Sequence, residues 1–91
     1  MPSYVAHIER SNRRALDDVE VRMTITDLST GRRSWRGEFT SRSAEGFLPS
    51  ERLVLTFDNG QKGTATVSET HFDSRTPDVT LIQFRGNGLL V

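Results

Sequence analysis

The sequence predicts a small all-β domain, either an antiparallel β-barrel or a compact sandwich of about six strands. Apolar residues recur at every second position in nearly every segment, which is typical of strands with one buried face. Turn-forming residues separate these segments, and apolar patterns of helical period are too short for more than one or two helical turns. Closure into a barrel is favoured because the open edges of a small sheet invite association with other chains.

Six segments carry this alternation. Their inward-facing residues are expected to be Tyr4, Ala6 and Ile8; Val19, Val21, Met23 and Ile25; Trp35, Gly37 and Phe39; Leu53, Leu55 and Phe57; Ala65 and Val67; and apolar residues of the segment 79–84. The last segment breaks the alternation, since Val79 and Leu81 fall on one phase and Ile82 and Phe84 on the other. A bulge, or burial of both faces, would produce that break.

Turn chemistry fixes the register of the hairpin predicted over residues 19–40. A three-residue loop at residues 29–31 makes apolar residues face one another along the ladder; the pairs are Ile25–Trp35, Met23–Gly37 and Val21–Phe39. On the opposite face the same register sets Arg22 across from Glu38. An opposite-charge pair at that position supports the ladder, so both faces indicate one register.

A second hairpin is predicted over residues 51–68. A two-residue turn at Asn59 and Gly60 would put Lys62 on the core face, which the apolar pattern excludes. A three-residue loop with Gly60 in the left-handed conformation keeps the apolar residues together. The expected pairs in that register are Leu53–Ala65 and Leu55–Gly63.

The connections are expected to contain whatever helical structure the chain forms. Ser11 can cap a single helical turn within residues 10–18, which are mostly polar. Residues 41–50 contain Gly and Pro and predict a loop that packs Phe47 and Leu48 under the sheet. The strand order does not follow from these patterns.

Size and charge narrow the range of functions. Ninety-one residues allow one hydrophobic core, so residues 1–91 are expected to form a single domain. The net charge of zero gives no basic field for nucleic acid or anionic membranes, and neither partner is expected. The sequence contains no cysteine and no apolar stretch of membrane-spanning length, and its first ten residues are not expected to act as a secretory leader. A cytoplasmic protein without a cofactor is therefore predicted.

One group of residues has the chemistry of a metal site. Glu69, His71 and Asp73 alternate, so their side chains share one face of an extended chain and can hold a divalent cation. Such a site would support a metal-dependent enzyme. The alternative is that the three side chains are simply solvated where the chain leaves the fifth strand.

A family resemblance adds a nucleotide-binding alternative. Residues 10–14, Arg-Ser-Asn-Arg-Arg, fit the Arg-x-x-x-Arg element of PilZ domains, and residues 41–46 resemble their Asp-x-Ser-x-x-Gly element with Ser41 at the Asp position. PilZ domains are β-barrels that bind cyclic di-GMP. The resemblance implies that Arg10 and Arg14 would grip the guanines and phosphates, while Ser43 and Gly46 continue the pocket.

The leading functional prediction is a non-enzymatic binding or assembly module that acts through its surface or by self-association with a second copy or another protein. Apolar residues on both phases of the last strand, followed by an apolar end of the chain, suggest a contact surface. The predicted interface residues are Ile82, Phe84, Leu89, Leu90 and Val91.

Overall fold

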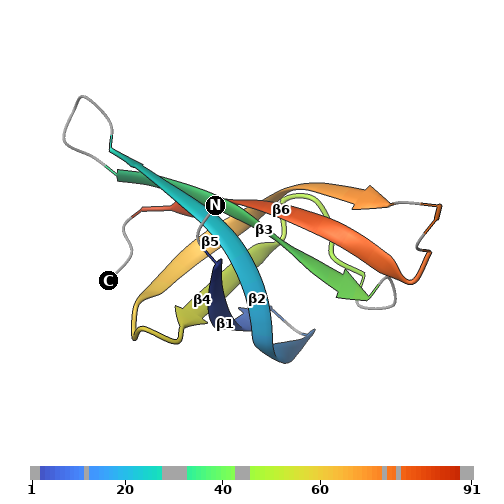
Figure 1. The fold of residues 1–91 in the computed structure, drawn as a ribbon, viewed down its shortest axis with the longest axis horizontal. Helices are drawn as coiled ribbons and strands as arrows, with labels where there is room; N and C mark the ends of the chain where they lie inside the picture. Colours follow the sequence, from blue (N-terminus) through green and yellow to red (C-terminus); the bar gives the residue numbers. More distant parts are fainter. Residues whose placement is uncertain are drawn as a thin grey trace.

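The protein folds as a closed barrel of six antiparallel strands (Figure 1). A computed structural model describes residues 3–11, 13–27, 33–42, 46–72, 74–75 and 77–88. The strands are β1 (Ser3–Arg10), β2 (Arg13–Asp27), β3 (Arg33–Arg42), β4 (Arg52–Phe57), β5 (Lys62–Phe72) and β6 (Val79–Asn87). They follow the order β1-β2-β3-β6-β5-β4 around the barrel, and β4 closes it by pairing with β1. The all-β prediction is confirmed, and the barrel is the correct choice between the two architectures.

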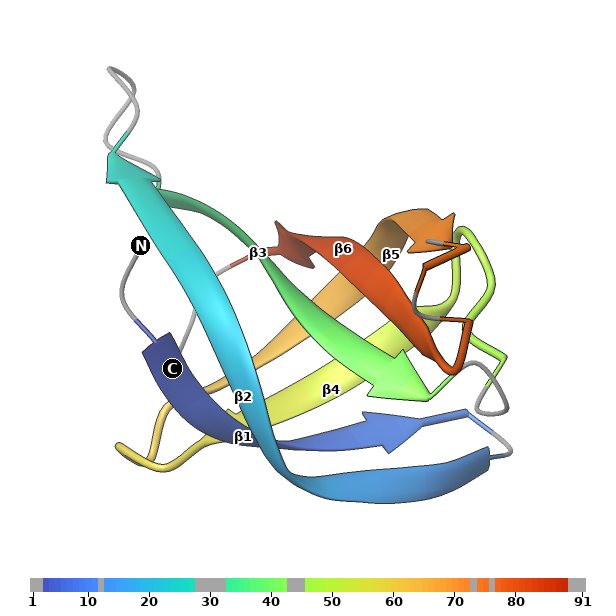
Figure 2. The same ribbon diagram turned by 45° about the vertical axis from the view of Figure 1, so that its right-hand side comes forward.

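Strand β2 is long and bent, and it pairs with two neighbours in turn (Figure 2). Its first half pairs with β1 and its second half with β3. The bend coincides with a register shift, since Ala6 pairs with Val19 whereas Ile8 pairs with Leu16. Asp18 has a φ of 53° at this shift, a conformation that Asp tolerates better than most residues. The bulge lets one strand turn from one side of the barrel to the next.

The helical turn predicted within residues 10–18 is wrong. The chain instead makes a short turn at Ser11 and continues as strand from Arg13. A segment of this length gains little from forming a helix in isolation. Pairing with β1 satisfies its backbone groups and packs Leu16 and Val19 against the core. No helix occurs among the residues that the structure describes.

The register of the β4–β5 hairpin is confirmed. Leu53 pairs with Ala65 and Leu55 with Gly63, as the three-residue loop requires. The loop closes with the Phe57 N–H donating to the Gln61 carbonyl at 2.8 Å, and Gly60 has a φ of 90°. The positive φ explains why glycine occupies this position.

The β2–β3 register is also confirmed over its ladder. Met23 pairs with Gly37, Ile25 with Trp35 and Arg22 with Glu38, and the last two residues form an ion pair at 3.3 Å. The ladder ends at Arg22–Glu38, so the expected Val21–Phe39 pair lies beyond its end. The predicted loop at residues 29–31 is outside the described residues.

One expected core residue of this hairpin is exposed. Ile25 keeps the predicted phase but is 41% exposed, whereas its partner Trp35 is 1% exposed. The β2–β3 ribbon extends beyond the rest of the barrel at this end, which leaves less structure to cover Ile25 (Figure 2).

The barrel interior holds the side chains on the inward phase of each strand. The buried apolar residues are Ala6, Ile8, Val21, Met23, Trp35, Phe39, Phe47, Leu53, Leu55, Phe57, Ala65, Val67, Ile82 and Phe84. Strand β6 directs Ile82 and Phe84 inward, while Val79 on the opposite phase is 39% exposed. The phase break of the sequence therefore reflects apolar residues on both faces of β6. The bulge lies in its partner β5, where Val67 faces Phe84 and Glu69 faces Gln83.

Two aromatic rings on β3 and β6 pack over glycines of the other strand. Gly37 on β3 pairs with Phe84 on β6, and a Cβ on Gly37 would lie 2.7 Å from Phe84 Cζ. Gly86 on β6 lies against Trp35 of β3, so a Cβ there would clash with the indole ring. The two rings meet edge to face with centroids 6.0 Å apart. Each glycine thus makes room for a ring from the neighbouring strand.

The replacement Gly86→Ala tests this packing. The added methyl group must displace the Trp35 indole, which is also held by a 2.9 Å hydrogen bond from its Nε1 to the Gly88 carbonyl. Overpacking of this kind costs about 1–3 kcal/mol, and we expect the free energy of unfolding in urea to fall by at least 2 kcal/mol. Ser34→Ala, on the exposed face of β3, is the control and should change it by less than about 0.5 kcal/mol. Equal stability of the two variants would contradict the packing argument.

Candidate functional site

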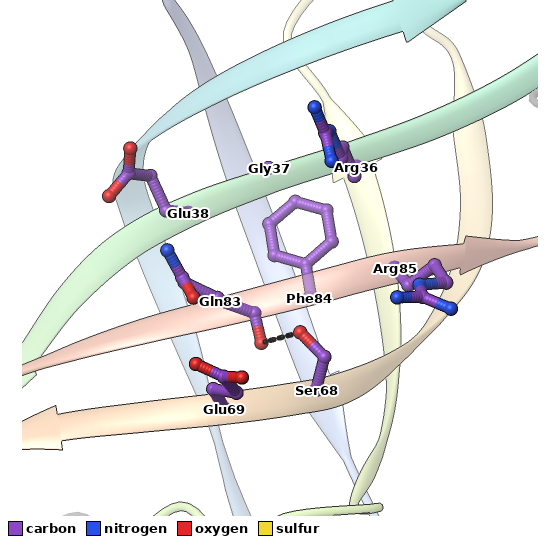
Figure 3. Close-up of a pocket in the computed structure, with 8 residues that line it drawn as sticks. All are labelled: Arg36, Gly37, Glu38, Ser68, Glu69, Gln83, Phe84 and Arg85. Carbon is purple, nitrogen blue, oxygen red and sulfur yellow. Dashed lines mark hydrogen bonds between the residues drawn. The ribbon is translucent and has the colours of Figure 1, made fainter.

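The best candidate site is a groove on the outside of the barrel, over β3, β6 and β5 (Figure 3). We call it the outer groove; it encloses about 400 Å³ and is lined by Arg36, Gly37, Glu38, Ser68, Glu69, Gln83, Phe84 and Arg85. Gly37 and Phe84 belong to the inward phase and form its floor. Outward-facing polar side chains form its walls, so the alternation of the strands produces both the core and the groove.

The β5 bulge shapes one wall of the groove. Between the Val67–Phe84 and Glu69–Gln83 pairs, Ser68 is an extra residue without a partner in the ladder. Its hydroxyl group donates to the Gln83 carbonyl at 3.2 Å (Figure 3). A bulge redirects the side chains around it, and here Ser68 and Glu69 both reach the groove.

The charged residues of the outer groove separate into two ends. Arg36 and Arg85 are direct cross-strand partners and lie at one end. Glu38 and Glu69 lie at the other end, with Gln83 near them (Figure 3). The groove therefore offers cationic donors at one end and carboxylate acceptors at the other.

Within the part of the chain that the structure describes, only the carboxylates at the acidic end contact an ionisable partner. Glu38 pairs with Arg22 at 3.3 Å, and Glu69 Oε2 lies 3.0 Å from His71 Nε2. Arg36 and Arg85 are exposed and have no ion-pair partner among the described residues. Like charges directly opposite each other destabilise a ladder, and a bound anion would offset that repulsion.

Two neighbouring guanidinium groups suit an anion with several oxygens. Arginine donates in a planar fork that matches carboxylate and phosphate, and charge-assisted hydrogen bonds are stronger than neutral ones. Because the groove is open, salt will screen these contacts and a single anion will bind weakly. The arrangement can therefore recognise charge and hydrogen-bonding pattern on the surface of a partner.

The structure brings together two of the three predicted metal ligands. Glu69 and His71 share the outer face and contact each other, and His71 Nε2 also lies 3.2 Å from Gln83 Oε1. Both side chains are more than half exposed, and Asp73 lies outside the described residues. No group of three potential ligands is present among the described residues. The metal site stays a prediction.

Arg10, predicted as a ligand-binding residue, is part of a buried cluster. Its side chain is 1% exposed and forms two hydrogen bonds to the Glu51 carboxylate, at 2.5 and 2.9 Å. Its Nη2 also lies 3.4 Å from the Gly46 carbonyl, 36 residues away, and its guanidinium stacks 3.8 Å above the Phe47 ring. Arg10 therefore contacts Gly46, but its guanidinium group is hydrogen-bonded to the Glu51 carboxylate. Arg14 is exposed, and Ser43 lies outside the described residues.

This cluster covers one end of the barrel. Phe47 is buried, as predicted, and packs edge to face against Phe39 with ring centroids 5.4 Å apart. The prediction for Leu48 is wrong, since its side chain is 58% exposed. A turn explains the difference: the Glu51 N–H donates to the Leu48 carbonyl at 3.1 Å and directs Leu48 away from the core.

Two of the residues predicted to form an interface on the last strand are buried. Ile82 and Phe84 are each 1% exposed and belong to the core, so neither offers an apolar surface to a partner, and Phe84 forms only the floor of the outer groove. They lie on the inward phase of β6, where the alternation requires burial. Leu89, Leu90 and Val91 lie outside the described residues.

The replacement Glu51→Gln tests the role of Arg10. It leaves a buried guanidinium without its counter-charge, and breaking a buried pair costs about 3–5 kcal/mol. We expect the free energy of unfolding to fall by about 3 kcal/mol in a urea titration, because Glu51 retains some solvent contact. Arg14→Gln removes a charge from an exposed position and should leave the stability unchanged. A Glu51→Gln variant as stable as the parent would contradict the structural role of this ion pair.

Comparisons with known proteins give no information on the function of this chain. The chain matched no protein-family model, no curated protein and no solved structure. Among the described residues there is no helix long and apolar enough to cross a membrane.

Proposed function

We propose that the chain is a non-enzymatic binding module that recognises an anionic group of its partner in the outer groove. The observation that carries this proposal is the Arg36–Arg85 pair, two exposed cations that face each other across the ladder. Neither has an ion-pair partner among the described residues. Recognition needs fixed charges and open space. Both are present at this place on the barrel.

The scaffold supports the proposal because it holds the two arginines at a defined separation. They stand on β3 and β6, whose register is fixed by a ladder from Arg36–Arg85 to Arg42–Val79. Directly beneath them, Phe84 packs against Gly37 in the core. A binding group built on packed strands loses less conformational freedom than one built on a loop.

Other predicted properties are separate from this proposal. Self-association through residues 89–91 stays a prediction, and sedimentation of a chain lacking these residues would test it. A cytoplasmic location, which the absence of cysteine suits, also stays a prediction.

The double variant Arg36→Gln/Arg85→Gln tests the anion site. In NMR titrations at low salt with inorganic phosphate and with acetate, we expect saturable amide shifts at Arg36, Gln83 and Arg85 at millimolar concentrations. Loss of two charge-assisted donors should weaken the binding at least about tenfold, because each ten-fold step corresponds to about 1.4 kcal/mol. Arg42→Gln, which changes an exposed arginine of β3 outside the groove, is the matched control and should bind like the parent. Shifts that are absent, or that persist unchanged in the double variant, would contradict the proposal.

The nucleotide-binding alternative has one observation in its favour, the contact between Arg10 and Gly46 across the two PilZ-like elements. A titration with cyclic di-GMP separates the two proposals. Saturable shifts at Gly46 and Arg14, unaffected by the Arg36→Gln/Arg85→Gln change, would support the alternative. Shifts confined to the outer groove would support anion recognition there.

A further inference from the structure

The cationic pair of the groove belongs to a longer row of residues that crosses the barrel. Successive ladders place five residues side by side on neighbouring strands; in order they are Thr24 on β2, Arg36 on β3, Arg85 on β6, Thr66 on β5 and Arg52 on β4. We call this set the arginine row. Its members face outward, because flanking residues such as Trp35, Phe84 and Leu53 are buried.

The three arginines of the row have similar surroundings. Arg36, Arg85 and Arg52 are exposed, and none forms an ion pair with the residues that the structure describes. Between Arg85 and Arg52, the Thr66 hydroxyl accepts a hydrogen bond from Asn87 Nδ2 at 2.7 Å. Positive charge therefore extends beyond the groove, across four adjacent strands from β3 to β4.

The spacing of the row favours an extended ligand with several negative charges. Neighbouring strands lie about 4.8 Å apart, so Arg52 is anchored roughly 10 Å along the surface from Arg85. In an extended peptide, side chains on one face recur about every 6.8 Å. Long arginine side chains can accommodate the difference, and carboxylates at alternate positions of such a peptide would meet the row in succession.

We infer that the partner is a protein with an extended acidic segment, whose carboxylates contact Arg36, Arg85 and Arg52 in turn. This inference rests on the proposed function, because it names the partner of the same groove. It adds Arg52, which does not line the groove, as a specificity-determining residue.

The chemistry next to the row favours a peptide over a nucleic acid. Glu38, Glu69 and Gln83 offer oxygen acceptors beside the arginines, and a peptide backbone has N–H groups that can donate to them. A phosphodiester backbone has no donor for these carboxylates. Single-stranded nucleic acids also bind through exposed aromatic rings, and the one exposed Phe among the described residues, Phe72, is not part of the row.

The experiment compares two synthetic peptides on the full chain. One carries glutamate at alternate positions along eight residues, and the other keeps one glutamate and has glutamine at the remaining acidic positions. Binding to the parent, Arg52→Gln, Arg36→Gln/Arg85→Gln and the control Arg42→Gln is measured by fluorescence anisotropy at low salt. Circular dichroism melting shows that each variant is folded.

We expect Arg52→Gln to lower the affinity for the multiply acidic peptide about two- to fivefold, as the loss of one exposed ion pair does. The affinity for the single-glutamate peptide should not change. The double variant should bind both peptides more weakly than the parent, and Arg42→Gln should bind both like the parent. Added salt should reduce the affinity of the multiply acidic peptide more than that of the other.

Three outcomes would overturn the inference. If Arg52→Gln binds the multiply acidic peptide like the parent while the double variant does not, the extended row is wrong and the proposed anion site stands. If the double variant binds both peptides like the parent, or the parent binds neither, the proposed function fails as well. If a thymidine oligonucleotide of equal charge binds more tightly than the multiply acidic peptide, the partner class is wrong.

Discussion

The reciprocal packing of aromatic rings on glycines between β3 and β6 is the constraint on which the rest of this barrel depends. These strands are far apart in the sequence, so no short turn fixes their register. Phe84 over Gly37 and Trp35 over Gly86 fix it instead, because a shift by one residue would set rings against side chains. The same register brings Arg36 opposite Arg85, so the outer groove depends on contacts made inside the barrel.

A buried ion pair has a comparable role at the end of the barrel that Phe47 covers. Arg10 continues the inward phase of Ala6 and Ile8, and it meets Glu51 and the face of Phe47 instead of an apolar neighbour. Burying two charges contributes little net stability, but the pair has strict geometric demands. It therefore holds the segment 46–51 in one position over the core. Arginine serves two purposes in this chain, as a structural residue inside and as an exposed charge outside.

Much of the local structure followed from the sequence, and the non-local structure did not. Alternation located the six strands, and the loop lengths gave two registers, because both depend on residues close together in the chain. The pairings β3–β6 and β1–β4 carry no such local signal, and Arg36, Arg85 and Arg52 become neighbours only through them. One signal was available and missed: Arg10 shares the inward phase of Ala6 and Ile8, which predicts burial with a counter-charge. The strand conformation of residues 13–18 was hidden by their polarity and by the bulge at Asp18.

Because the arginine row runs across the strands, its anchor points are independent of the connections at either end of the barrel. The β4–β5 turn lies at one end, and the segment 46–51 and the β5–β6 connection lie at the other (Figure 2). Insertions and exchanges in such connections are tolerated far better than changes within packed strands. Related chains, or engineered ones, can therefore gain additional contacts by lengthening these loops while the central recognition surface keeps its dimensions.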